Sequence, residues 1–153
     1  MYRYLVSVEL VDLIPNSLSF RIVTTLDLDD REAVPDGFTG RVRRSHAGHP
    51  VSSAWYQDGL LHSPSRTHPA FRWFRAGGRV KYEMWYSHGS LDDPAPDAPA
   101  VRGYFAGGGC HYEERWAMGR RHDGHDGTPA IRKWRADGSL RHELRYQHGS
   151  RAA

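Results

Sequence analysis

The sequence has a single cysteine and no long hydrophobic run, and both deficits limit what the protein can be. Cys110 is the only cysteine among 153 residues, so no disulfide can form within the chain and we expect a reducing compartment. The first residues contain no charged segment followed by an apolar stretch, because Glu9 and Asp12 interrupt them. We therefore expect no signal peptide, no membrane span and a cytoplasmic location.

Motifs that mark common enzyme classes are also lacking. The sequence contains no phosphate-binding Walker loop, no dinucleotide fingerprint, no Gly-x-Ser-x-Gly elbow and no His-Glu-x-x-His pair. The length fits one continuous domain and is too short for a two-domain enzyme with a deep cleft between domains. We therefore predict that the protein is not an enzyme and uses no cofactor.

Charge is distributed unevenly along the chain. Residues 1–38 carry three arginines against seven acidic residues, whereas residues 39–153 carry eighteen lysines and arginines against eleven acidic residues. Two interpretations follow: the acidic segment docks on the basic part or solvates its own loops, or the basic part offers a surface to an acidic partner. We expect residues 1–38 to form an N-terminal cap and residues 39–153 to form the rest of the same domain.

The basic part repeats itself every 30 residues without a gap. Pro69-Ala70 recurs as Pro99-Ala100 and as Pro129-Ala130. Other positions recur in the same register: Gly78, Gly108 and Gly138; Glu83, Glu113 and Glu143; Gly89, Gly119 and Gly149; Phe74, Tyr104 and Trp134; Tyr86, Trp116 and Tyr146. The copies lie near residues 40–68, 69–98, 99–128 and 129–151, and the first is degraded. A period of this length indicates one supersecondary unit stacked on copies of itself.

The pattern within the unit is that of a β-hairpin. Strand-like segments at 70–75, 100–105 and 130–135 are each followed by a glycine-rich turn and a second alternating segment. Ahead of the repeats, Tyr2 to Leu10 and Leu18 to Leu26 alternate in the same way around a turn at 14–17, and Asp27 to Gly37 suits either an acidic loop or a single helical turn. The sequence thus predicts an all-β fold, an elongated twisted antiparallel meander of repeated β-hairpins with an N-terminal hairpin cap.

Alternation divides the second strands into two faces. One face is mostly apolar and carries these residues: Val80, Tyr82, Met84 and Tyr86; Cys110, Tyr112, Glu114 and Trp116; Leu140, His142, Leu144 and Tyr146. Cys110 therefore stands where Val80 and Leu140 stand, which favours a small buried hydrophobe over a nucleophile. The opposite face is polar. We expect Glu83, Glu113 and Glu143 to pair there with Lys81, Arg115, Arg141 or Arg145 as a structural ladder, because equivalent environments do not suit general acid–base catalysis.

These residues resemble a known repeat family. The repeated pattern is similar to the MORN-type repeat, in particular its bacterial and phage variant, which is antitoxin-like in some proteins. The residues that carry the resemblance are Trp73, Phe74, Gly78, Glu83, Tyr86 and Gly89; Tyr104, Gly108, Glu113, Trp116 and Gly119; and Trp134, Gly138, Glu143, Tyr146 and Gly149. The resemblance covers roughly residues 40–151, although this unit is longer than the usual one. It implies a scaffold whose role in such proteins is protein binding, membrane association or unknown. For this chain it suggests an antitoxin or a phage-encoded inhibitor that acts by occupying a host protein.

We predict a non-enzymatic binding protein that engages a protein partner through its basic and aromatic sheet face and loops. A solvent-facing Trp beside arginines is typical of an interface anchor. The predicted partner-binding residues are Trp85, Arg115, Arg145, Lys81, Arg141, Arg120 and Arg121. The alternative is a nucleic-acid-binding module, because arginines interleaved with aromatics suit phosphates and bases. Its predicted residues are Arg43, Arg72, Arg132 and Lys133.

A loop rich in His and Asp and an unpaired last strand are two further features of the sequence. The segment His122-Asp123-Gly124-His125-Asp126-Gly127 holds two His and two Asp within five residues, but a glycine-interrupted loop holds ligands poorly, so we favour a solvated loop over a metal site. The last strand, near Ser139 to Tyr146, has no predicted neighbour. An exposed edge of this kind allows a homodimer to form through pairing of the two edges.

Overall fold

The structure is a computed structural model that describes the backbone of residues 3–10 and 20–152 and the side chains of residues 23–152. These described residues form strands and no helix, which confirms the all-β prediction. The strands are β1 (Arg3–Leu10), β2 (Phe20–Asp29), β3 (Gly40–His46), β4 (His49–Gln57), β5 (Leu60–Leu61), β6 (Phe71–Phe74), β7 (Val80–Met84), β8 (Tyr86–Ser87), β9 (Ser90–Leu91), β10 (Val101–Tyr104), β11 (Cys110–Glu114), β12 (Trp116–Ala117), β13 (Arg120–Arg121), β14 (Ile131–Trp134), β15 (Leu140–Leu144), β16 (Tyr146–Gln147) and β17 (Ser150–Arg151).

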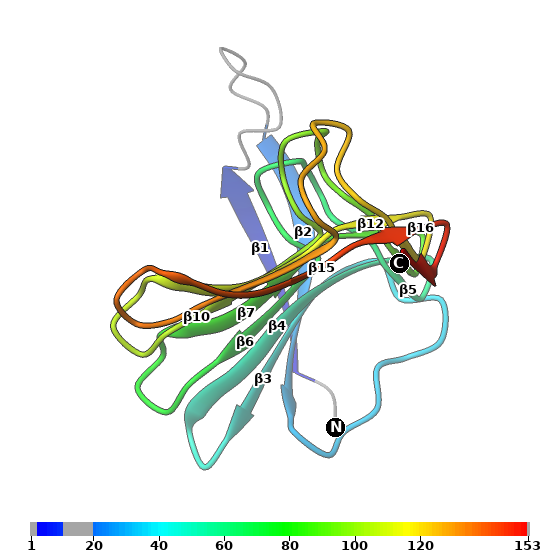
Figure 1. The fold of residues 1–153 in the computed structure, drawn as a ribbon. Helices are drawn as coiled ribbons and strands as arrows, with labels where there is room; N and C mark the ends of the chain where they lie inside the picture. Colours follow the sequence, from blue (N-terminus) through cyan, green and yellow to red (C-terminus); the bar gives the residue numbers. More distant parts are fainter. Residues whose placement is uncertain (1–2, 11–19, 153) are drawn as a thin grey trace.

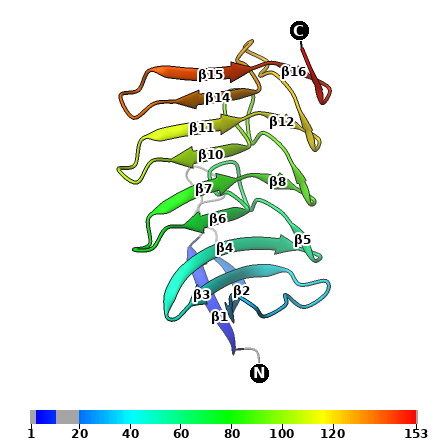
Figure 2. The same ribbon diagram turned by 60° about the horizontal axis from the view of Figure 1, so that its bottom comes forward.

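One large sheet runs through the molecule in chain order. Its strands follow the order β1-β2-β3-β4-β6-β7-β10-β11-β14-β15, with β5 paired to β4. Figure 2 shows the hairpins stacked from the N-terminal to the C-terminal end. The predicted N-terminal hairpin is present as the antiparallel pair β1–β2, whereas its predicted turn lies outside the described residues. The step from β2 to β3 differs from a strict antiparallel meander, because these two strands pair in parallel.

Each repeat contains a second, shorter hairpin that the sequence analysis missed. The long strands β7, β11 and β15 end at Met84, Glu114 and Leu144. The next residue, which is Trp85, Arg115 or Arg145, belongs to no strand. The chain then forms the short hairpins β8–β9, β12–β13 and β16–β17. His88, Met118 and His148 have φ of 45°, 46° and 50°, each followed by a glycine with positive φ. This is the geometry of a two-residue type I′ turn, so these glycines lie at the tip of a hairpin. In Figure 1 the short hairpins form a separate arm of the stack.

A β-bulge in each long hairpin changes the expected division into faces. The register shifts between Trp73 and Phe74, so that Tyr82 lies opposite Trp73 but Val80 lies opposite Phe74. Equivalent shifts occur in the other two complete copies. An extra residue in one strand reverses the alternation beyond it. Val80, its counterparts Cys110 and Leu140, and the bulge residue Lys81 were therefore assigned to the wrong faces.

A small cluster of buried hydrophobic residues lies at the N-terminal end of the sheet, and single buried residues such as Val101 and Ile131 continue along it. Leu26, Leu28 and Val42 are almost fully buried, and Val34, Phe38 and Tyr56 pack against them. Phe38 meets Tyr56 edge to face at 6.4 Å between ring centroids. Of the segment Asp27 to Gly37, residues 27–29 extend β2 and residues 30–37 contain no helix, so the acidic-loop alternative is correct from residue 30 onward. The loop covers one face of the sheet only at this end.

The C-terminal end of the sheet is an exposed edge in the described part of the chain. The edge strand β15 pairs with β14 alone among the described residues, and Leu140 is 47% exposed. Homodimer formation through this edge stays a prediction. Within the described ranges, none of the chain forms a helix of the length and hydrophobicity needed to cross a bilayer.

Candidate binding surfaces

The residues at the break of each repeat hold the preceding loop. Trp85 is 4% exposed and donates Nε1–H to the carbonyl of Arg66 at 3.1 Å. Arg115 is 3% exposed and donates from Nη1 to the carbonyl of Pro96 at 3.0 Å. Arg145 donates from Nη1 to the carbonyl of Gly127 at 3.0 Å, although its side chain is half exposed. The prediction of a solvent-facing anchor is therefore wrong for Trp85 and Arg115, which are structural.

The residue that receives these side chains changes with them. In the two copies with arginine, an aspartate carboxylate faces the guanidinium: Asp93 lies 3.3 Å from Arg115, and Asp123 lies 3.2 Å from Arg145. In the copy with Trp85, the equivalent position is Ser63. Each of the three residues accepts the same two backbone N–H groups, as Asp93 does from Ala100 and Trp116. The aspartates therefore share the structural role of Ser63 and add a negative charge beside the arginine. Burial raises the pKa of the Asp93 carboxyl, although the hydrogen bonds from the Trp116 and Ala100 amides act in the opposite direction.

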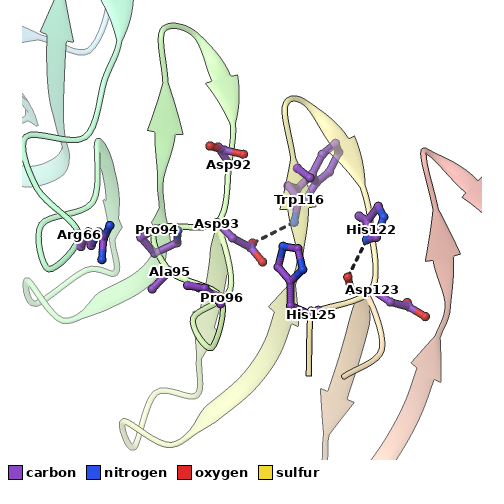
Figure 3. Close-up of a pocket in the computed structure, with 12 residues that line it drawn as sticks. Arg66, Asp92, Asp93, Pro94, Ala95, Pro96, Trp116, His122, Asp123 and His125 are labelled. Carbon is purple, nitrogen blue, oxygen red and sulfur yellow. Dashed lines mark hydrogen bonds between the residues drawn. The ribbon is translucent and has the colours of Figure 1, made fainter. Parts of the chain in front are cut away.

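A hollow of about 360 Å³ lies between successive loops of the first and second complete copies, at residues 92–96 and 122–125. Figure 3 shows His125 standing between Asp93 and His122, with the Asp93 carboxylate bonded to the Trp116 amide. Asp123 accepts the amides of Ala130 and Tyr146 and the Arg145 guanidinium. Both carboxylates are thus already committed to the backbone and to arginines. Such groups suit a structural joint better than acid–base catalysis.

The His-Asp loop uses several of its ligand atoms internally. His122 Nδ1 lies 2.6 Å from the Asp123 carbonyl, and Asp126 accepts the Thr128 amide at 2.9 Å. Within the described residues, three possible ligand atoms come within 4.8 Å of one another only at Asp29, Asp30 and His46, which are all exposed. The two His and two Asp that the sequence analysis weighed as metal ligands are therefore not brought together. Exposed acidic groups of this kind are common without an ion.

One face of the sheet carries a row of alternating charges, which we call the charge row. Successive cross-strand partners from β2 to β15 are Asp27, Arg43, Ser53, Arg72, Glu83, Arg102, Glu113, Arg132 and Glu143. Ion pairs join Arg43 to Asp27 at 2.7 Å, Arg72 to Glu83 at 2.9 Å and Arg132 to Glu113 at 2.7 Å. Opposite charges directly across a sheet stabilise strand pairing.

The charge row corrects two predictions. The ion-pair partners of Glu83 and Glu113 are first-strand arginines, Arg72 and Arg132, and not the second-strand cations that alternation suggested. Glu83 also accepts a hydrogen bond from the Tyr104 hydroxyl at 2.7 Å. Arg43, Arg72 and Arg132, predicted for a nucleic-acid surface, each face a carboxylate. Each of these ion pairs therefore offsets part of the positive charge of its arginine within the sheet.

The opposite face carries a continuous run of rings, which we call the aromatic strip: Trp73, Tyr82, His111 and Tyr112. Neighbouring ring centroids lie 6.3 Å, 6.0 Å and 6.3 Å apart along it. Lys81 Nζ lies 4.6 Å from the Trp73 ring centroid, and Lys133 Nζ lies 5.1 Å from that of Tyr112. Trp73 is 43% exposed. Lys81, predicted for the polar face, and Lys133, predicted for a nucleic-acid surface, thus belong to the aromatic face.

A glycine makes the strip continuous. Gly103 occupies the repeat position of Trp73 and Lys133, and a Cβ there would lie 2.7 Å from Tyr82 Cε1 and 3.1 Å from Tyr112 Cβ. The missing side chain lets Tyr82 lie across β10 towards His111. Burial and the cations Arg75, Lys133 and Lys81 lower the pKa of His111. The strip is therefore apolar along its rings and positive at its margins.

Of the other predicted residues, Arg120 and Arg121 lie in the short hairpin β12–β13, whereas Arg141 in β15 occupies the repeat position of Lys81 and His111, next to the cross-strand partner of Lys133. Arg120 in β13 and Arg141 in β15 are exposed. Arg121 is half-buried, lies over the Trp116 ring at 5.0 Å and contacts Glu114 at 3.2 Å. Glu114 is buried where Met84 and Leu144 stand in the other copies, and it also accepts the Tyr112 hydroxyl and the Trp116 indole N–H. Arg121 therefore neutralises a buried carboxylate.

Cys110 was predicted to be a buried hydrophobe and is half-buried, and burial raises the pKa of its thiol. A raised pKa lowers the fraction of thiolate, the nucleophilic form.

Comparisons with family models, curated proteins and solved structures gave no match for this chain. The MORN-type assignment therefore stays a prediction. Sequence reasoning missed the aromatic strip because it treated the ring-rich face as core. The sequence did contain a pattern that predicts an exposed strip. An all-β repeat of this length, with no predicted helix, has no second layer that could cover both faces of one sheet.

Proposed function

We propose that this chain is a non-enzymatic β-repeat binding protein whose aromatic strip engages an acidic segment of a protein partner. One observation carries the proposal: rings in mutual contact run across β6, β7 and β11 on a face without a second layer in the described structure, with Trp73 43% exposed. Contiguous exposed apolar surface rimmed by polar residues is typical of interaction sites. Trp and Tyr are also the residues most enriched among binding hot spots.

The margins of the strip favour an acidic partner. Lys81 and Lys133 lie over its two ends, and Arg75 is close enough to lower the pKa of His111. Positive charge of this kind accelerates encounter with an acidic surface and selects against basic ones. An antitoxin or a phage-encoded inhibitor that acts by occupancy is the physiological form of this proposal, in line with the resemblance to MORN-type repeats.

The test compares two double charge reversals in a pull-down from nuclease-treated bacterial lysate. Lys81→Glu with Lys133→Glu alters the strip, whereas Arg120→Glu with Arg151→Glu makes the same change of net charge at exposed positions on the short hairpins. We expect the parent and the second variant to retain one partner, and the first variant to lose it by about tenfold or more. If instead the second variant lost the partner and the first retained it, the binding site would lie on the short hairpins, where the sequence predicted Arg120 and Arg121.

Nucleic-acid binding is the second candidate function. Rings about 6 Å apart with lysines over them also suit successive unpaired bases and phosphates. This alternative predicts binding of single-stranded nucleic acid that weakens steeply with salt and is lost on changing Lys133→Glu. Changing Arg43, Arg72 or Arg132, which already face carboxylates, should have a smaller effect. A protein partner retained at high salt would count against it.

A further inference from the structure

The charge row is interrupted at one position in the degraded first copy. Ser53 stands 30 residues before Glu83, and in the same register as Glu113 and Glu143. Its direct cross-strand partners are Arg43 in β3 and Arg72 in β6. Glu113 likewise lies between Arg102 and Arg132. At Ser53, two arginines therefore flank a hydroxyl where the other copies place a carboxylate.

A surface hollow of about 470 Å³ opens at this interruption. Arg41, Arg43, Arg44 and Arg72 line it, with Asp27 as the one acidic residue among its described lining. Asp27 accepts Nε and Nη2 of Arg43 at 2.7 Å and 2.8 Å, and Glu83 accepts Nε of Arg72 at 2.9 Å. A guanidinium has five N–H donors in a rigid fork, so these bonds leave the terminal amino groups of Arg72 for another acceptor. Among the described lining residues, four arginines thus stand against one carboxylate.

We propose that this hollow binds a phosphate group, which supplies the negative charge that Ser53 does not. Guanidinium groups match phosphate oxygens in both geometry and charge. The Ser53 hydroxyl is a further donor, and the excess of arginines over carboxylates favours a dianion over a single carboxylate. The phosphate is free or is carried by a larger ligand. The site lies on the face opposite the aromatic strip, so it stands independently of the proposed function.

The first experiment measures binding of inorganic phosphate to the full chain by calorimetry at low ionic strength. We expect one site in the parent protein. Ser53→Glu should weaken phosphate binding by about tenfold or more, because it places the repeat's own carboxylate between Arg43 and Arg72. Ser150→Glu makes the same charge change at an exposed position on β17 and should leave binding unchanged. Equal loss in both variants, or no binding to the parent, would overturn the proposal.

A gain of function provides the second experiment. Glu113→Ser recreates the interruption between Arg102 and Arg132, and we expect the stoichiometry for phosphate to rise from about one to about two. Comparing inorganic phosphate with O-phosphoserine and with adenosine monophosphate then identifies the source. Equal affinities indicate free phosphate, and tighter binding of one organic ester indicates that class of ligand. Equally tight binding of acetate would contradict the preference for phosphate.

Discussion

At the scale of the residue, one repeat position shows how a charge is tolerated inside a thin protein. Trp85, Arg115 and Arg145 each donate a hydrogen bond to a carbonyl of the preceding loop. Only the arginine copies carry an aspartate beneath, where the Trp85 copy has Ser63. The chain therefore contains two solutions to the same packing problem, an indole over a serine and a guanidinium over an aspartate.

This pairing predicts the cost of removing the counter-charge alone. Asp93→Ser keeps an acceptor for the Ala100 and Trp116 amides, as Ser63 does in its own copy, but leaves the buried Arg115 without its carboxylate. We expect a loss of about 3 kcal/mol in the free energy of unfolding, measured with urea. The double variant Asp93→Ser with Arg115→Trp should recover much of this loss, because it reproduces the earlier copy.

The third complete copy supplies the control. Arg145 is half exposed, so Asp123→Ser should cost only about 1 kcal/mol. Equal losses at the two positions would show that the backbone bonds, and not the buried charge, decide the stability of this joint.

At the scale of the element, the short hairpins use different side chains for the same bond. His62 Nδ1 accepts the amide of His88 at 3.2 Å, and one repeat later the Asp92 carboxylate accepts the amide of Met118 at 2.9 Å. Only an unprotonated Nδ1 can accept this bond. Burial and the neighbouring His88 lower the pKa of His62, so the folded protein holds this imidazole neutral.

The direction of the pKa shift determines the pH dependence. Because the pKa of His62 is lower in the folded protein than its unfolded value of about 6.5, its contribution to stability is complete above that pH and is lost as the pH falls through the folded value. We expect His62→Asp, which copies Asp92, to reduce the fall in melting temperature below about pH 6.5. His142→Asp, at an exposed position on β15, should leave the pH profile as in the parent. Identical profiles for the parent and His62→Asp would contradict this account.

At the scale of the whole molecule, stability is distributed unequally between the two ends of the sheet. The described hydrophobic cluster lies in β2, β3 and the loop between them, whereas β15 at the other end is mostly exposed. Repeats that touch chiefly their neighbours contribute to stability almost one at a time. The N-terminal cap is therefore expected to be indispensable and the last copy dispensable.

Truncation tests this asymmetry. A chain ending at residue 128 should still unfold cooperatively in urea, with a smaller denaturant dependence in proportion to the surface removed. A chain starting at residue 39 lacks Leu26, Leu28, Val34 and Phe38, and should not fold, as judged by circular dichroism. Loss of folding in the first truncation together with retention in the second would reverse the assignment of the stabilising end.

Patterns in the amino-acid sequence were sufficient to predict the all-β class, the 30-residue period and the hairpin as the repeated unit. These features depend on local chemistry, because glycines permit the turns and alternating residues define strands. The same local information identified the N-terminal hairpin and the glutamate positions of the charge row.

Which side chains are exposed depends on how the strands pair and pack, and this is visible only in the folded protein. The bulge after Trp73 reverses alternation, and the break at Trp85 places that side chain under a loop. Glu83 and Glu113 each form an ion pair with an arginine of a neighbouring strand. These are relations between strands separated along the chain, so a pattern read along one strand does not contain them. For the same reason, the aromatic strip and the interruption at Ser53 became visible only when the strands were placed side by side.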